Sequence, residues 1–378
     1  MTFSTRSAFE SAPNELAVAL ERRRARGEAV IDLTESNPTR AGIPYDERAI
    51  TEALADPRSM RYEPEPFGLP SARDVIARMY GVDASRVMLT ASTSEAYGFL
   101  FTLLCDPGDE VLTPAPSYPL FAQLARIAGV RLVPYRLRYD GAWHVDLASL
   151  RAARTDRSRA ILAVSPNNPT GSCLRREELA AMLDLPVICD EVFAEYTFRG
   201  DAERVPCAAK EARGGLVFSM GGLSKSAALP QMKLAWTIVG GPEARVAPAL
   251  ERLAFVADAY LSVATPVQHA LPKLLAVGRK SRDAIVTRAT KNLAVLDSAT
   301  RGTTATRLDL EAGWYATLRV PHIRSEMETC LAALERGVYV HPGAFFGFED
   351  EAYVIISLLA PEDDFARGTK LLLETITE

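Results

Sequence analysis

The sequence predicts an α/β fold in which one large domain, with a mostly parallel β-sheet flanked by helices, is combined with a smaller α+β domain. Short apolar runs alternate with helical stretches through the middle of the chain, and this alternation stops beyond Leu261. The chain has 378 residues, of which 48% are hydrophobic and 24% charged, so it is globular and long enough for more than one hydrophobic core.

The N-terminal segment predicts one helix and one extended stretch. We expect a helix over Ser11–Arg26, because Leu16 and Leu20 lie on one face of it. Residues Ile31–Arg40 are predicted to be extended, and the pair Asn37-Pro38 within them is typical of a turn.

The middle of the chain predicts strands joined by helices. Helices are expected over Ser94–Cys105 and Ser117–Ala128. Strands are expected at Arg86–Thr90, Glu110–Thr113, Val130–Val133, Ala160–Ser165, Val187–Asp190, Leu216–Ser219 and Leu234–Val239. Strands connected in this way form a parallel sheet that is covered on both faces.

The C-terminal third has a different pattern. Two long helical stretches, Pro266–Ala276 and Arg282–Leu296, come first. Short strands follow around Gly313–Val320, Val338–Val340 and Tyr353–Leu358, which indicates an α+β arrangement.

Composition excludes several classes of function. The net charge is −5, from 43 Lys+Arg against 48 Asp+Glu, which argues against nucleic acid or an anionic membrane as the main partner. Apolar runs stay shorter than the roughly 18 residues of a membrane span, and the N-terminus has no signal-peptide core. The five cysteines include no C-x-x-C pair, so we expect a cytoplasmic protein.

Motifs for metal and nucleotide binding are missing. The histidines are scattered without H-E-x-x-H or a Cys/His cluster, so no metal site is predicted. The segment Gly221–Ser226 is not a phosphate loop, because Ser224 stands directly before its lysine, where that motif has a glycine.

The sequence allows two interpretations of Lys225 and two of Asp190. Lys225 lies between two apolar runs, so its amine either reaches solvent or sits in a dry cleft with a lowered pKa, able to form a Schiff base. Asp190 ends a strand, where it either belongs to a turn with Glu191 or faces a ligand such as a pyridinium nitrogen.

Three segments in order resemble the signature blocks of class I/II aminotransferases of the fold-type I pyridoxal-phosphate family. They are SPNNPTG at Ser165–Gly171, DEVFAEY at Asp190–Tyr196 and GGLSKSAALPQMKLAW at Gly221–Trp236, where PQMKLAW marks a subgroup. The likeness runs from about Ile31 to the C-terminus. It implies pyridoxal 5'-phosphate as cofactor and transfer of an amino group between an amino acid and a 2-oxo acid.

The resemblance also implies an architecture. The large cofactor-binding domain would span residues 46–262, and the small domain would be discontinuous, with residues 1–45 and 263–378. The expected assembly is a homodimer with its active site at the interface.

Roles for single residues follow from the same resemblance. Lys225 would form the Schiff base and carry a proton, Asp190 would keep the ring nitrogen protonated, and Asn168 would donate to the ring oxygen beside the substrate carboxylate. The other implied cofactor contacts are Tyr118 on the ring, Ser92, Thr93 and Ser224 at the phosphate, and Tyr62 at the phosphate from a second subunit.

The sequence departs from the family pattern at three places. Phe193 replaces a tyrosine, and Lys233 replaces the phosphate-pairing arginine eight residues beyond the lysine. Ile355 stands where the family has the arginine that binds the substrate carboxylate, and Arg40 is our candidate for its role. A displaced carboxylate would change which bond at the substrate carbon breaks. The alternatives are therefore a carbon–sulfur lyase, a racemase or an oxidase, or else a cofactor-binding protein without turnover.

Overall fold

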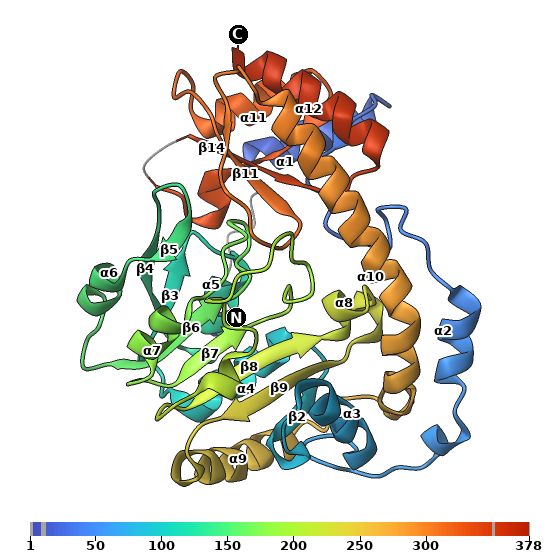
Figure 1. The fold of residues 1–378 in the computed structure, drawn as a ribbon, viewed down its shortest axis with the longest axis vertical. Helices are drawn as coiled ribbons and strands as arrows, with labels where there is room; N and C mark the ends of the chain where they lie inside the picture. The colour runs from blue at the N-terminus through green and yellow to red at the C-terminus, as the bar shows by residue number, and fades with distance from the viewer. Residues whose placement is uncertain (1–2, 9–12, 350–351, 378) are drawn as a thin grey trace.

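The computed structural model describes residues 3–8, 13–349 and 352–377, and it consists of a large and a small layered part (Figure 1). The large sheet and its helices form the lower part in this view, and the small sheet with α1, α11 and α12 forms the upper part. Helix α10 (Thr265–Ala299) runs along one side and spans both.

The large part contains an eight-stranded sheet in the described part of the chain. Its order is β2 (Val87–Thr90), β9 (Ala235–Gly240), β8 (Val217–Gly222), β7 (Val187–Asp190), β6 (Ser158–Val164), β3 (Glu110–Ala115), β4 (Arg131–Tyr139) and β5 (Trp143–Val145). Strands β8, β7, β6, β3 and β4 pair in parallel, whereas β9 and β5 run antiparallel to their neighbours. The predicted α/β class with a mostly parallel sheet is confirmed.

Helices cover both faces of this sheet because its strands are apolar on both sides. Val187 and Val217 face one hydrophobic cluster, whereas the adjacent Ile188 and Phe218 face the other, as the two-residue period of a strand requires. Helices α3 (Pro70–Tyr80), α6 (Leu147–Ala152), α7 (Arg176–Met182) and the first half of α10 contribute to the first cluster, and α4 (Thr93–Leu104), α5 (Leu120–Ala128) and α9 (Glu243–Asp258) to the second.

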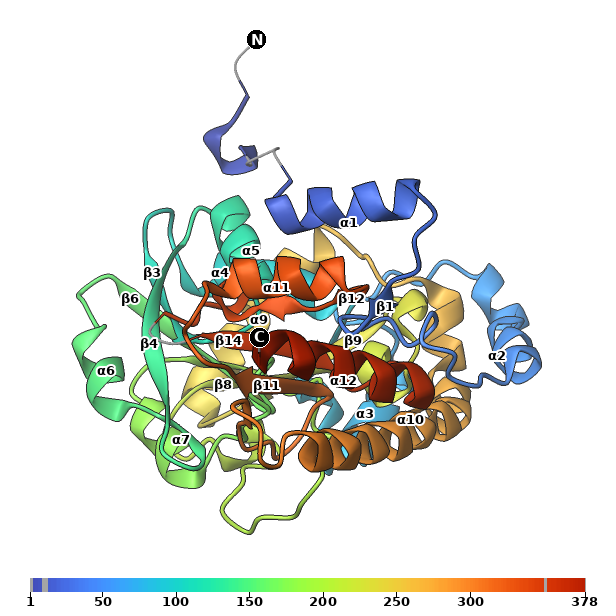
Figure 2. The same ribbon diagram turned by 90° about the horizontal axis from the view of Figure 1, so that it is seen from above.

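The small part joins the two ends of the chain. Its antiparallel sheet has the order β10 (Thr306–Arg307), β11 (Tyr315–Arg319), β14 (Tyr353–Ser357) and β13 (His341–Pro342), and β1 (Ile31–Asp32) pairs in parallel with β12 (Val338–Tyr339). Helix α1 (Glu15–Ala25) packs on α11 (Glu326–Glu335), α11 on α12 (Glu362–Thr377), and α12 on α10 (Figure 2). Leu16 and Phe365 thus share one core. The domain boundaries at 45/46 and 262/263 stay a prediction.

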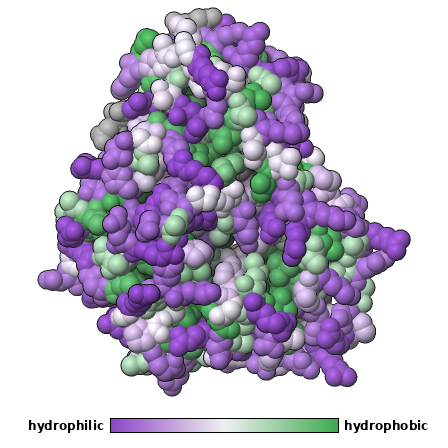
Figure 3. Space-filling view, viewed as in Figure 1, coloured by the Kyte–Doolittle hydropathy of each residue, from purple (hydrophilic) through white to green (hydrophobic). Residues whose placement is uncertain are grey.

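Two helices and several short turns complete the element order. They are α2 (Glu47–Leu54), α8 (Leu223–Ser226) and the 3₁₀ turns at Thr5–Ser7, Pro57–Met60, Ala84–Arg86, Ala208–Glu211, Pro230–Met232 and Gly343–Phe346. The face in Figure 3 is mainly hydrophilic, with hydrophobic residues in smaller groups between. None of the described helices is long and apolar enough to cross a membrane.

Two expectations about single elements need correction, and a third lies partly outside the described residues. The stretches Pro266–Ala276 and Arg282–Leu296 belong to one helix, α10, because Gly278 continues the helix where a break was expected. A Cβ at Gly278 would lie 2.5 Å from Cβ of Ala227, so this glycine allows α10 to approach the segment after Lys225 closely.

At the N-terminus, the stretch Ile31–Arg40 keeps only two residues in a strand before it turns. The first residues of the helix expected over Ser11–Arg26 lie outside the described residues. The described helix α1 begins at Glu15, with Asn14 as its N-cap.

Candidate active site

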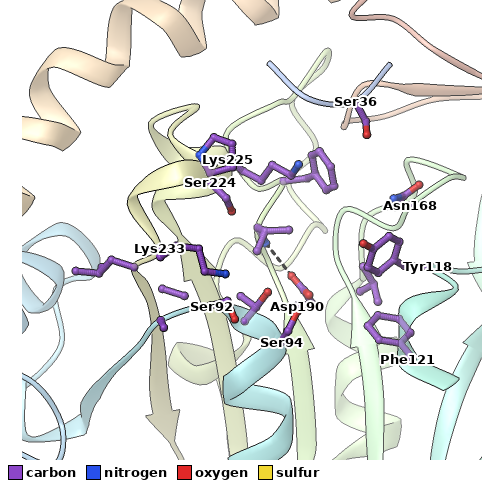
Figure 4. Close-up of a pocket in the computed structure, with 18 of the residues that line it drawn as sticks. Ser36, Ser92, Ser94, Tyr118, Phe121, Asn168, Asp190, Ser224, Lys225 and Lys233 are labelled. Atoms are coloured by element: carbon purple, nitrogen blue, oxygen red, sulfur yellow. Dashed lines mark hydrogen bonds between the residues drawn. The ribbon is translucent and has the colours of Figure 1, made fainter. Parts of the chain in front are cut away.

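A cavity of about 290 Å³ opens at the carboxyl ends of β6, β7 and β8, where an α/β sheet binds its ligands (Figure 4). Both parts of the molecule line it, since Tyr315 comes from β11 and Ser36 from the segment after β1. Eight residues predicted from the sequence line this one cavity: Ser92, Thr93, Tyr118, Asn168, Asp190, Ser224, Lys225 and Lys233.

Lys225 lies on α8, immediately beyond the end of β8, and extends into the cavity (Figure 4). Its Nζ is 4.3 Å from the ring centroid of Trp314 and 5.1 Å from that of Phe193. Aromatic faces favour the ammonium form, and so does the charge of Asp190, but burial outweighs them and lowers the pKa of Lys225 to about 8. A substantial fraction of this amine is therefore neutral and nucleophilic near neutral pH.

Asp190 is the last residue of β7, and its side chain is buried. One oxygen accepts a hydrogen bond of 2.9 Å from the hydroxyl of Tyr97, and the other accepts one of 3.2 Å from the backbone N–H of Val192. Figure 4 shows Asp190 at the base of the cavity. Burial raises the pKa of Asp190, while these two donors and Lys225 lower it. Its two hydrogen-bond donors are neutral, so a cationic ligand would stabilise the carboxylate further.

Two adjacent asparagines in the loop after β6 have different tasks. Asn167 is used within the loop: its Nδ2 donates to the carbonyl of Pro116 and to Thr170, and its Oδ1 accepts from Ser117. Asn168 is equally buried and lines the cavity, yet its Oδ1 has no hydrogen-bond partner in the described structure. A buried amide without a partner in a cavity fits a ligand that completes its hydrogen bonds.

An anion site lies at the first turn of α4. Ser92 caps this helix by accepting from the N–H of Glu95 at 3.2 Å, and Thr93 is its first residue. The N–H groups of the first turn attract anions, and Ser224 and Lys233 line the same side of the cavity (Figure 4). Lys233 has a φ of +50°, a left-handed backbone conformation that is unfavourable for a residue other than glycine. The arrangement fits a phosphate group.

The remaining residues fit an aromatic ring between these groups. Tyr118 is 41% exposed at the cavity, and Phe121 holds its ring edge-to-face at a centroid distance of 5.8 Å. An exposed aromatic face can stack on a ligand ring. An amine, a carboxylate, an unpaired amide, an aromatic face and an anion site thus lie around one cavity, and they fit pyridoxal 5'-phosphate.

Two residues predicted for the site do not line this cavity. Tyr62 is 81% exposed and borders a separate, smaller cavity with Phe99 and Gln268. Arg40 is exposed in the turn that begins at Asn37. The roles expected for both stay predictions.

The sequence analysis missed Ser36 and Tyr315, which line the cavity. Ser36 precedes the Asn37-Pro38 turn and Tyr315 begins a strand, and neither position carried a chemical signal of its own. Ile355 is buried on β14, where it pairs with Thr317 and His341, so an apolar side chain occupies this position.

Known proteins share this fold. Alanine aminotransferase from Pyrococcus furiosus superposes with a TM-score of 0.86 at 25% identity, covering 99% of this chain and 100% of that one. An aminotransferase from Escherichia coli gives a TM-score of 0.85 at 21% identity, covering 100% and 98% of the two chains, and this likeness concerns the fold alone.

Relatives by sequence cover a part of the chain. An aspartate aminotransferase of Streptomyces avermitilis is 32% identical over 248 residues, which are 62% of this chain and 60% of the relative. An alanine aminotransferase of Mycobacterium bovis is 28% identical over 281 residues, 70% of this chain and 64% of the relative. The chain thus spans less than two thirds of the length of these curated relatives.

The family model described as "Aminotransferase class I and II" matches residues 28–364. This range includes all three described sheets and every residue that we describe in the cavity. The chain belongs to the class I and II aminotransferase family.

Proposed function

We propose that this protein is a pyridoxal-phosphate-dependent aminotransferase, which moves an amino group between an amino acid and a 2-oxo acid. The observation that carries the proposal is Lys225, whose amine has a pKa of about 8 in a cavity shared with the Asp190 carboxylate. The matching relatives named aspartate and alanine aminotransferase support the same activity.

The cofactor's place is proposed from the cavity. Lys225 would hold it covalently, the first turn of α4 with Ser224 and Lys233 would hold its phosphate, and Tyr118 and Asn168 would contact its ring. Pyridoxal 5'-phosphate, when bound, withdraws electrons from the carbon that carries the amino group and so makes its hydrogen acidic.

The chain's own residues would then handle the protons. Asp190 would hold a proton at the ring nitrogen, because a carboxylate with neutral hydrogen-bond donors is stabilised by an adjacent positive charge. The neutral Nζ of Lys225 would take the proton from the substrate carbon, for which a pKa of about 8 is well suited. The rings of Phe193 and Trp314, next to this Nζ, would shield it from water.

The assembly and location that we propose are a homodimer in the cytoplasm. Tyr62 does not line the cavity, so it would contribute to a phosphate site only from a second subunit. Met60, Tyr62, Phe255 and Tyr260 are exposed apolar side chains, a kind of surface that subunit contacts cover. All five cysteines lie in the described chain and are free, which supports a reducing compartment.

The activity can be tested in a single half-reaction. Purified protein loaded with pyridoxal 5'-phosphate is mixed with L-alanine, L-aspartate or L-glutamate in turn, and the visible absorbance and the products are measured. We expect at least one amino acid to yield its 2-oxo acid in stoichiometric amount, without ammonia. Continuous release of ammonia would indicate a lyase, and inversion of the amino acid's chirality would indicate a racemase. If no product forms from any of the amino acids, the protein lacks this activity.

The assembly can be tested with mixed subunits. The variants Lys225→Ala and Tyr62→Ala are each expected to lose most activity as homodimers. A mixed dimer would contain one site with an intact lysine from one chain and an intact Tyr62 from the other, so activity should return on mixing. Mixtures that stay as inactive as the separate variants would argue against a role of Tyr62 across the interface.

A further inference from the structure

We propose that the hydroxyl groups of Ser36 and Tyr315 bind the substrate's carboxylate, so that neutral donors recognise it. This inference rests on the proposed function, because it names the group that an amino acid presents to one wall of the same cavity. Both side chains line the cavity, and they come from the small part of the molecule.

The distribution of charge in the cavity is the first argument. The cationic side chains among its described lining residues are Lys225 and Lys233. Lys225 carries out the chemistry, and Lys233 lies on the side of Ser92, away from Ser36 and Asn168 (Figure 4). The wall that Ser36, Tyr315 and Asn168 form is therefore polar but uncharged.

The second argument is that the donors of this wall are its hydroxyl groups. Asn168 is more than nine-tenths buried, but its unpaired Oδ1 is an acceptor, so this atom does not bind a carboxylate. Ser36 lies near enough to Tyr315 to lower the pKa of its phenol. Burial raises this pKa more than Ser36 lowers it, so the phenol keeps its proton and remains a donor.

The third argument is that the structure holds both hydroxyls in place. Tyr315 on β11 pairs with Ser357 on β14. The N–H of Ser357 donates to the carbonyl of Leu33, and its Oγ donates to the carbonyl of Glu35, both at 2.6 Å. Ser357 thus fixes the segment that leads to Ser36 beside Tyr315, and we regard it as a positioning residue.

The described residues around Ile355 on β14 provide no positive charge that would bind the carboxylate in place of these hydroxyl groups. Ile355 on β14 shares a sheet face with Thr317 and His341, because residues directly opposite each other point to the same side. Burial lowers the pKa of His341, which leaves its imidazole neutral near neutral pH. A site of this kind should bind a carboxylate weakly and discriminate little between an acid and its neutral amide.

Two matched probes test the wall. One is 2-methylalanine, which has an amine and a carboxylate but no hydrogen on the carbon between them. The other is tert-butylamine, in which a methyl group replaces the carboxylate. Dissociation constants of both are measured by spectral titration of the loaded enzyme. Melting temperatures are recorded in parallel for Ser36→Ala, Tyr315→Phe and the control Tyr339→Phe, whose position on β12 lies outside the cavity.

We expect Ser36→Ala and Tyr315→Phe each to raise the dissociation constant of 2-methylalanine about tenfold. The constant for tert-butylamine and the melting temperature should stay as in the parent, and Tyr339→Phe should change neither constant. Unchanged binding of 2-methylalanine by both variants would overturn the proposal. Equal losses for the two probes would also overturn it, because the hydroxyls would then not act on the carboxylate.

The rate of the half-reaction gives an independent readout. L-Alanine and L-alaninamide should react with kcat/KM values within about tenfold of each other. The reason is that a hydroxyl group can donate a hydrogen bond to a carboxylate oxygen or to an amide oxygen. A preference for the acid above about tenfold would show that a cation binds it, and would refute the neutral wall. If neither compound nor any amino acid reacts, the proposed function itself fails, which is a different outcome.

Discussion

The two sides of the cavity are built in different ways. The floor, with Asp190, Lys225 and the first turn of α4, stands on the ends of buried, parallel strands whose register is fixed by two hydrophobic clusters. The opposite wall, with Ser36 and Tyr315, comes from segments far apart in the chain, which meet through the hydrogen bonds of Ser357. A rigid floor suits the shared chemistry of a family, whereas a wall held by few contacts can change its substrate without disturbing that chemistry.

The largest effect should follow from removing the amine of the floor. Lys225→Ala should lower the rate of the half-reaction about 10⁴-fold, because the group that moves the substrate proton is lost. The measurement is a single-turnover assay, together with borohydride treatment and mass analysis, which should show no covalent cofactor. Lys210→Ala, at an exposed lysine, serves as the control and should keep full activity. If the Lys225→Ala variant remains active, Lys225 is not the group that moves the substrate proton.

A second prediction concerns the buried carboxylate beside Asp190. Burial raises the pKa of Glu191 to about 7, while its Oε1 accepts from the N–H of Ala208 and the hydroxyl of Ser219. The folded protein thus keeps a proton that the unfolded chain loses near its ordinary pKa of 4.5. Stability from this group is complete below pH 4.5 and is lost as the pH rises to 7.

Glu191→Gln should remove this loss, because the amide oxygen can accept the same two hydrogen bonds without a charge. We expect the variant to be more stable than the parent by about 3 kcal/mol at pH 8, and equally stable near pH 4.5. Urea unfolding at the two pH values measures the difference, with exposed Glu203→Gln as the control. A constant difference between variant and parent across this range would contradict the assigned protonation.

The smallest effect concerns the phosphate side of the floor. Lys233→Ala should raise the dissociation constant of pyridoxal 5'-phosphate about tenfold, since one charged partner at the edge of the cavity is lost. The variant Lys233→Arg should bind the cofactor with the parent's affinity, because it keeps a positive charge at this position. Equilibrium dialysis of the cofactor-free proteins measures both constants. Equal affinities of Lys233→Ala and the parent would leave the phosphate to the α4 N-terminus alone.

The same contrast explains what could be predicted from the sequence. Asp190 ends an apolar strand and Asn168 lies in the loop after another, so local pattern alone places them at one edge of the sheet, where the structure has them. Ser36 and Tyr315 could not be found in this way, because their meeting depends on pairing between β11, β14 and the segment after β1. Similarly, the separation of Pro266–Ala276 from Arg282–Leu296 was wrong, since one helix includes both and Gly278 between them allows a close contact with Ala227.

Helix α10 gives the molecule a mechanical link between these two sides. Its 35 residues form a rod about 52 Å long. Gly278, near the middle of this helix, lies so close to the segment that follows Lys225 that a methyl group there would collide with Ala227, and the helix also packs against α12. Helix α10 therefore contacts both the turn that carries the reactive amine and the C-terminal helix of the small part, from which Ser36 and Tyr315 come.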